Sequence, residues 1–146
     1  VYAVESAMSR VQLFADITHL TTWDLSALGA IETRGITLDG DGNVYVVNTS
    51  GGIIHRINAD GSGTDTIGSK GSGDGQLSGP WDVAVDGSGS IFVADRGNNR
   101  VQVFDKQGDF LTGWGEFGGG DGQFKQPMGI DLDSDGNVYV TELANA

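Results

Sequence analysis

Apolar and polar residues alternate in short runs between Asp74 and Gly115, and glycine, aspartate, asparagine or proline bounds each run. Alternation with a period of two is typical of a half-buried strand, and the bounding residues are typical of turns. The pattern predicts four strands, in this order: Trp81–Asp86, Ile91–Asp95, Arg100–Phe104 and Phe110–Trp114. The second of these runs is apolar on both faces, which predicts that other sheets pack on both sides of it.

The same pattern recurs along the whole chain of 146 residues. Equivalent residues begin the second strand of each repeat at intervals of 43, 47 and 47 residues: Val1, Val44, Ile91 and Val138. Four strands in about 42 residues is the size of one β-propeller blade. The sequence therefore predicts an all-β fold of four-stranded antiparallel blades, about three in the chain, each stabilised by its neighbours.

We expect residues 1–146 to form a single propeller segment. The repeats divide it into a partial blade at 1–23, blades at 35–67 and 80–115, and a second partial blade at 127–146. The first partial blade begins at a second strand, because its residues match the later repeat from that strand onward. Local propensity would also allow a helix over 5–14, but the match to 95–104 favours two strands there.

The composition narrows the range of partners. The chain has 20 acidic and 8 basic residues and a formal net charge of −12. A surface this acidic repels phosphate groups, and no cluster of lysine and arginine offsets it, so nucleic acid and anionic membranes are disfavoured. The chain has no cysteine, which excludes disulfides and thiolate chemistry, and no apolar run near 18 residues. These features select no compartment, and we predict no cofactor.

Several motifs of the central unit recur in register and carry a resemblance. They are D-G-Q-x4-P (74–80, 121–127), G-I-x-L-D (35–39, 129–133), G-N-V-Y-V (42–46, 136–140), D-x3-N-R-V-Q-V-F-D (95–105) and G-x-F-L-x-x-W-G (108–115). Together they resemble the NHL repeat, a β-propeller repeat, over essentially the whole chain. Asp82 departs from the glycine that begins the second of these motifs elsewhere.

The resemblance implies a ring that usually has six blades, whereas this chain would supply about three. The chain would then be either a piece of a longer propeller or a half-ring. A half-ring would expose sheet at both ends, and a second copy could cover both, giving a homodimer that closes a six-bladed ring. Residues 138–146 repeat 1–9, and this overlap favours a piece of a longer chain.

Three groups of residues offer candidate chemistry, and each has a structural alternative that we favour. The D-x-D-G-N segments at 39–43 and 133–137 resemble the start of a calcium loop, but they lack the later ligands and suit hairpin turns. His19 and His55 fall outside the innermost strands, too far apart for one metal site, and we expect both at the surface. Glu5 with Arg10, and Asp95 with Arg100, recur once per blade, which favours a structural clamp over catalysis.

Propellers usually bind ligands on a face of the disc near the central channel. Arg34, Trp81 and Met128 are equivalent positions at the starts of the innermost strands, and they carry large side chains of the kinds enriched at interfaces. Packing against the neighbouring blade would explain them equally well. With Asp82 and Asp131 beside them, they form the predicted binding site.

We therefore expect a non-catalytic module that binds a protein or peptide, and the acidic field favours basic partners. The alternative is a metal-dependent lyase or lactonase whose site, with Asp82 and Asp131 as ligands, is complete only in the full ring. RNA binding, which occurs in some proteins with this repeat, ranks last because of the charge.

Overall fold

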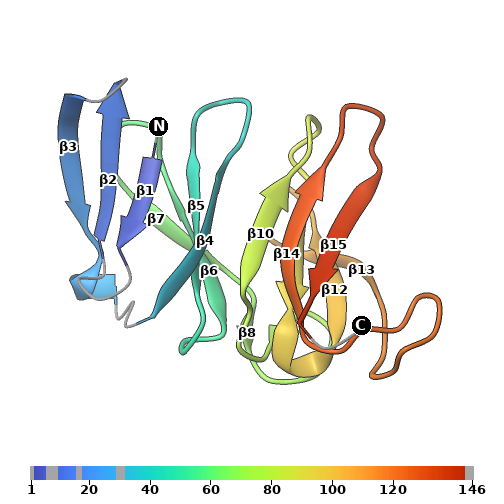
Figure 1. Ribbon diagram of the computed structural model, residues 1–146. Helices are drawn as coiled ribbons and strands as arrows, with labels where there is room; N and C mark the ends of the chain where they lie inside the picture. Colours follow the sequence, from blue (N-terminus) through green and yellow to red (C-terminus); the bar gives the residue numbers. More distant parts are fainter. Residues whose placement is uncertain (1, 6–9, 16–17, 29–31, 144–146) are drawn as a thin grey trace.

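The computed structural model describes residues 2–5, 10–15, 18–28 and 32–143. Its strands form antiparallel sheets in which each strand pairs with the next in sequence, as the alternating pattern predicts (Figure 1). The first sheet contains β1 (Tyr2–Glu5), β2 (Arg10–Ala15) and β3 (Thr18–Asp24). The second contains β4 (Thr33–Leu38), β5 (Val44–Asn48), β6 (Ile53–Ile57) and β7 (Thr64–Ile67).

The third sheet contains β10 (Asp82–Val85), β11 (Ile91–Asp95), β12 (Arg100–Phe104) and β13 (Phe110–Trp114). The fourth has β14 (Pro127–Leu132) and β15 (Val138–Glu142). The predicted all-β fold of propeller blades is confirmed. The described parts of 5–14 are strands, so the helical alternative is wrong there. None of the described residues forms a helix long and apolar enough to cross a membrane.

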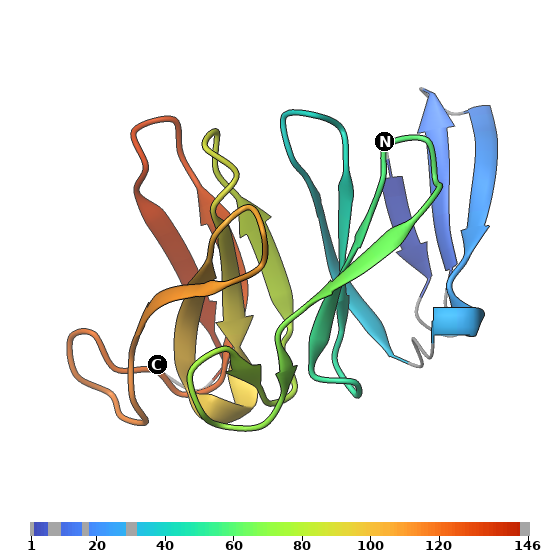
Figure 2. The ribbon, with the colours of Figure 1, turned by 180° about the vertical axis from the view of Figure 1, so that it is seen from behind.

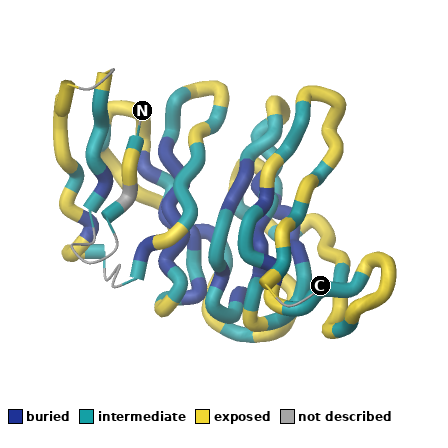
Figure 3. Tube along the Cα trace, viewed as in Figure 1, coloured by how far each residue is buried: buried dark blue, intermediate teal, exposed yellow. Residues whose placement is uncertain are grey.

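The sheets stand side by side as an arc, with the two termini toward its opposite ends (Figures 1 and 2). Their innermost strands are neighbours, with β10 between β4 and β14. The buried residues lie in the layers between successive sheets (Figure 3). The layer between the second and third sheets includes Tyr45, Ile67, Val93 and Phe104, and the layers on either side of it are apolar too. Each sheet is therefore buried by its neighbours.

One contact between sheets repeats along the arc. An apolar residue at or next to the end of the last strand of one sheet packs on a turn glycine of the next sheet. A Cβ atom added at Gly61 would lie 2.5 Å from Nε1 of Trp23, and one at Gly108 would lie 3.0 Å from Cγ1 of Ile67. Both glycines also have positive φ, at 79° and 97°. The turn between the third and fourth strands thus needs glycine for its conformation and for the close approach.

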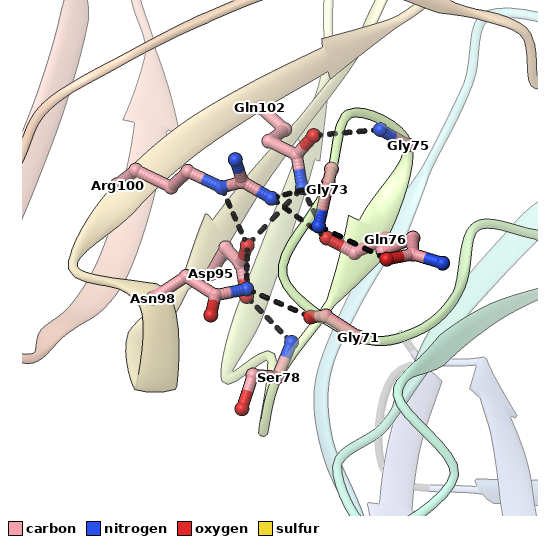
Figure 4. A network of polar contacts seen from close by, with 9 residues as sticks. All are labelled: Gly71, Gly73, Gly75, Gln76, Ser78, Asp95, Asn98, Arg100 and Gln102. Atoms are coloured by element: carbon pink, nitrogen blue, oxygen red, sulfur yellow. Dashed lines mark hydrogen bonds and ion pairs between the residues drawn. The ribbon is translucent and has the colours of Figure 1, made fainter.

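A buried polar network joins the third sheet to the connector before it (Figure 4). The carboxylate of Asp95 accepts bonds from Arg100 Nε at 2.9 Å and Gln102 Nε2 at 3.1 Å, among other donors. Arg100 and Gln102 in turn donate to the carbonyl of Gln76 in the glycine-rich connector. In the first sheet, Glu5 accepts bonds from Arg10 and Gln12 at the same repeat positions. The predicted clamp is confirmed by these bonds.

Some local features differ from the prediction. His55 is buried in β6, not at the surface, because it occupies the repeat position of Gln102. Burial lowers the pKa of its imidazole. The connector expected as a plain loop contains the short parallel pair β8 (Ser69–Lys70) and β9 (Gln76–Leu77). Two 3₁₀ turns were also not predicted: η2 (Ser26–Leu28) and η3 (Arg96–Asn98).

Candidate functional site

The starts of the three innermost strands border one groove on the edge of the arc that also carries η3. The groove has a volume of about 540 Å³. Its lining comes from β4, β10, β14, β15 and the residue just before β10, namely Thr33, Arg34, Gly35, Trp81, Asp82, Met128, Gly129 and Thr141. The strands meet closely here, and the amide of Gly35 donates a 3.0 Å hydrogen bond to the carbonyl of Trp81. The groove therefore lies where three successive sheets come together.

The indole of Trp81 is the central side chain of this region. The guanidinium carbon of Arg34 lies 4.4 Å from its ring centroid, and that of Arg96 lies 4.6 Å away. Cations at this distance are attracted to the aromatic face, and the stacking holds the ring in place. Arg34 also pairs with Glu32, and Arg96 donates a 2.7 Å bond to Gln126 Oε1. Arg34 thus lines the groove itself, whereas Arg96 lies next to it through its contact with Trp81.

Asp82 stands where the neighbouring innermost strands have Gly35 and Gly129. Its carboxylate accepts backbone bonds from Val83 at 3.0 Å and Ile130 at 3.1 Å, so it ties β10 to β14. Burial raises the pKa of the Asp82 carboxyl above its ordinary value, and the nearby charge of Asp131 acts in the same direction. The two backbone donors act against this rise. Asp82 is therefore a half-buried acid whose charged form is disfavoured on balance.

Asp131 lies outside the groove that Trp81 and Met128 line. It is exposed and borders a second groove of about 370 Å³, which Asp82 and Tyr139 also line. The two grooves share Asp82, Gly129 and Thr141. Of the five residues predicted for the binding site, Asp82 is thus the one that lines both grooves.

Thr33 contributes a polar atom whose bonding is incomplete. Its side chain is only 1% exposed, and its hydroxyl oxygen has no hydrogen-bond partner. A buried hydroxyl without a partner costs about 1–3 kcal/mol, so such atoms are rare in folded proteins. Thr33 lies at the wall of the groove, but its hydroxyl oxygen is buried beneath the surface.

Four of the five residues predicted from the sequence line the same groove: Arg34, Trp81, Asp82 and Met128. The fifth, Asp131, lines the adjoining one. Sequence reasoning missed Arg96 and Thr33. The repeat position of Arg96 is occupied by Thr49 and Leu143 in the neighbouring repeats. This change of residue type between repeats could have marked Arg96 as a candidate. Nothing in the sequence marks Thr33, because its significance is a missing partner.

The calcium-like segments serve as hairpin turns. Asp39 Oδ1 accepts the backbone amides of Asp41 at 3.0 Å and Asn43 at 2.9 Å. The equivalent Asp133 accepts the side-chain amide of Asn137, and these bonds lower its pKa to about 2. The turn interpretation is confirmed. Within the part of the chain that the structure describes, no three His, Cys, Asp or Glu residues are grouped to hold a metal.

Comparison with known proteins identifies a repeat and a fold. Residues 77–104 match the family model described as NHL repeat. A streptogramin B lyase structure superimposes with a TM-score of 0.70 at 13% identity, over 99% of this chain and 51% of the lyase chain. A chain of a nidogen/laminin complex gives 0.71 at 23% identity, over 97% of this chain and 52% of that one.

A third match is an auxiliary nutrient binding protein from Bacteroides thetaiotaomicron, with a TM-score of 0.69 at 16% identity, over 95% of this chain and 42% of that one. The chain thus spans about half the length, or less, of the solved chains it matches. No curated protein matches the sequence. At these identities the likeness shows the fold alone, since proteins with one fold have many functions.

Proposed function

Because the chain carries an NHL repeat within an arc of β-propeller blades, we propose that it is an interaction module without catalytic activity. Its ligand is a protein segment or peptide that lies in the groove beside Trp81. Arg34, Trp81 and Met128 supply the contact surface, and Asp82 forms the inner wall. The open groove on three successive strands is the observation that carries this proposal.

The chemistry of the groove suits a peptide. Two guanidinium groups stacked on the indole hold it in one position, so little side-chain entropy is lost when a ligand contacts the part of the ring that they leave exposed. Met128 offers an adaptable apolar contact on the same groove.

An enzymatic role is a second candidate because of Asp82. A carboxyl whose pKa is raised by burial is a possible general acid, and it lies in a groove. Both of its oxygens already accept backbone amides, however, which suits a tie between strands. Stoichiometric binding of a divalent metal by the purified chain, together with lyase or lactonase turnover that Asp82→Asn abolishes, would replace our proposal with this one.

A peptide selection tests the proposed function. Random nonapeptides are selected by display on the immobilised chain, and the enriched peptides are titrated against variants. We expect Trp81→Ala to weaken binding by about tenfold or more, as loss of an anchoring aromatic does. Trp114→Ala removes the same side chain from β13, where it is 38% exposed, and should leave binding unchanged.

The folding of each variant is checked by its urea midpoint. Arg34→Ala is a second variant at the groove that leaves the indole in place. The proposal fails if the selection enriches no peptide, or if Trp81→Ala and Arg34→Ala bind the enriched peptides as the wild type does.

A further inference from the structure

The surface around Trp81 continues outward past the groove. Arg96, whose guanidinium stacks on Trp81, also borders a second hollow of about 170 Å³. The other residues of this hollow are Gly97, Asn99, Phe117 and Gln126. Phe117 is 70% exposed and is the large apolar side chain of this hollow. We name the area from Met128 and Trp81 across Arg96 to Phe117 the rim surface.

The rim surface holds a cation between two apolar contacts. The Arg96 guanidinium stacks on Trp81, which lines the groove together with Met128, and Arg96 also lines the hollow that contains Phe117. Arg34 adds a second guanidinium on the indole. Near the indole, Glu32 pairs with Arg34 and Asp82 accepts two backbone amides, and beside Phe117 the carboxylate of Glu116 accepts a bond from Gln123. This order of side chains fits a chain with an acidic residue between two apolar ones.

Two further observations point to a ligand here. Nε of Arg96 is buried and has no hydrogen-bond partner, as is true of the Thr33 hydroxyl in the groove. Gln126, which receives a bond from Arg96, has a φ of 59°, a backbone conformation that side-chain-bearing residues rarely adopt. The backbone amide of Gln126 donates a 3.0 Å hydrogen bond to Asn99 Oδ1. Strain and incomplete bonding of this kind gather at binding sites.

We propose that the rim surface binds an extended acidic peptide. One carboxylate of the peptide pairs with Arg96, an apolar residue on one side of it covers Trp81 and Met128, and an apolar residue on the other side covers Phe117. This inference rests on the proposed function. It adds two features of the ligand, a negative charge and a second apolar residue that contacts Phe117. The sign is opposite to that expected from the net charge of −12, which favours basic partners.

The two charge effects act over different distances. The field of the whole protein acts during approach, and salt screens it over a Debye length of about 8 Å at physiological ionic strength. The contact with Arg96 acts only in the complex. An acidic peptide should therefore associate faster as salt is added, whereas a peptide steered by the acidic field should associate more slowly.

Three nonapeptide libraries test the proposal. They are random except for a central glutamate, glutamine or lysine, and each is selected separately on the chain. We expect the glutamate library to give the tightest binders, with apolar residues enriched on both sides. In such a binder, replacing glutamate by glutamine should weaken binding about tenfold, as loss of a charged hydrogen bond does. Its association rate should rise with salt.

Matched variants assign the contacts. Arg96→Gln should remove the difference between the glutamate and glutamine peptides, whereas Lys106→Gln, the same charge change at a distant ion pair with Asp41, should keep it. Phe117→Ser should weaken both peptides equally, whereas Leu111→Ser, at an exposed leucine on β13, should weaken neither.

The outcomes separate the two proposals. If the lysine or glutamine library gives the tightest binders and they need Trp81, the proposed function stands and the acidic peptide is wrong. Glutamate binders that Arg96→Gln leaves unchanged also overturn the inference. If no library yields a binder that depends on Trp81, both proposals are wrong.

Discussion

The side chain of Asp95 forms hydrogen bonds with several separate segments of this fold. It is fully buried, and its carboxylate accepts bonds from a backbone amide, a side-chain amide, a guanidinium and a second side-chain amide. The donors are Ser78, Asn98, Arg100 and Gln102. A buried carboxylate is tolerated only when it is paired and fully hydrogen-bonded. Its charge therefore secures both β12 and the connector that approaches it.

We expect Asp95→Asn to lower the free energy of unfolding by about 2–4 kcal/mol, because the amide leaves the buried Arg100 charge without its counterion. Urea denaturation measures the change. Asp65→Asn is the control, since Asp65 is an exposed partner of Arg56 and its loss should cost less than about 1 kcal/mol. Equal costs for the two variants would show that the buried network does not stabilise the fold.

The Asp95 pair could be predicted because both of its members recur with the repeat, as Glu5 and Arg10 do. The stacking of Arg96 on Trp81 could not be predicted in this way, because no other repeat has an arginine there. His55 was wrongly placed at the surface because histidine suggests a polar position. Comparison with Gln102, its buried counterpart, would have corrected this. Recurring residues thus predict the scaffold, while the candidate site depends on residues that occur once.

The strands β4 and β10 lie too close together at Gly35 to leave room for a side chain there. A Cβ atom added to Gly35 would lie 2.7 Å from Cα of Asp82 and would also collide with the Asp82 carboxylate. Asp82 therefore fits only because its neighbour on β4 has no side chain. The two residues act as a pair, one small and one large, that sets the spacing of the innermost strands.

Gly35→Ala should destabilise the protein by about 1–3 kcal/mol, because β4 and β10 must move apart to admit the methyl group. The unfolding midpoint in urea reports the loss. Gly87→Ala makes the same change in a turn where a Cβ atom would meet nothing within 4 Å, and its stability should match or slightly exceed that of the wild type. A Gly35→Ala protein as stable as Gly87→Ala would contradict the close packing described for these strands.

The outer strands were predicted to the residue, since β11, β12 and β13 have the expected bounds. The innermost strand β10 is one residue shorter at each end than the predicted run 81–86. The strands β8 and β9 were not predicted, because each has only two residues and lies in a glycine-rich segment. Its position follows from side chains of the third sheet, which a local pattern cannot reveal.

Over the whole arc, each sheet buries its neighbour, but one face of the fourth sheet stays exposed and carries two large apolar side chains beside the polar Asp131. Tyr139 on β15 is 57% exposed, and Leu143 just after it is 62% exposed. On the opposite face of β15, Val138 and Val140 pack on the third sheet. The number of blades in the chain could be predicted from the spacing of the repeat, whereas the number in a closed ring could not.

We expect the 146-residue chain to self-associate in solution, because covering this face removes apolar surface from water. Sedimentation velocity over a hundredfold range of concentration measures the effect. Tyr139→Glu should shift the chain toward the monomer, while Leu111→Glu makes the same charge change on β13 and should not. A wild-type chain that remains monomeric over the whole range would refute this prediction.

The docking of a strand end on a turn glycine sets a rule for building longer molecules. Residues 80–126 end their fourth strand in Trp114 and carry Gly108 in the matching turn. Copies of this segment joined head to tail would place each tryptophan over the glycine of the next copy, as Trp23 lies over Gly61. Tandem copies of the segment would therefore repeat one kind of contact from sheet to sheet along the arc.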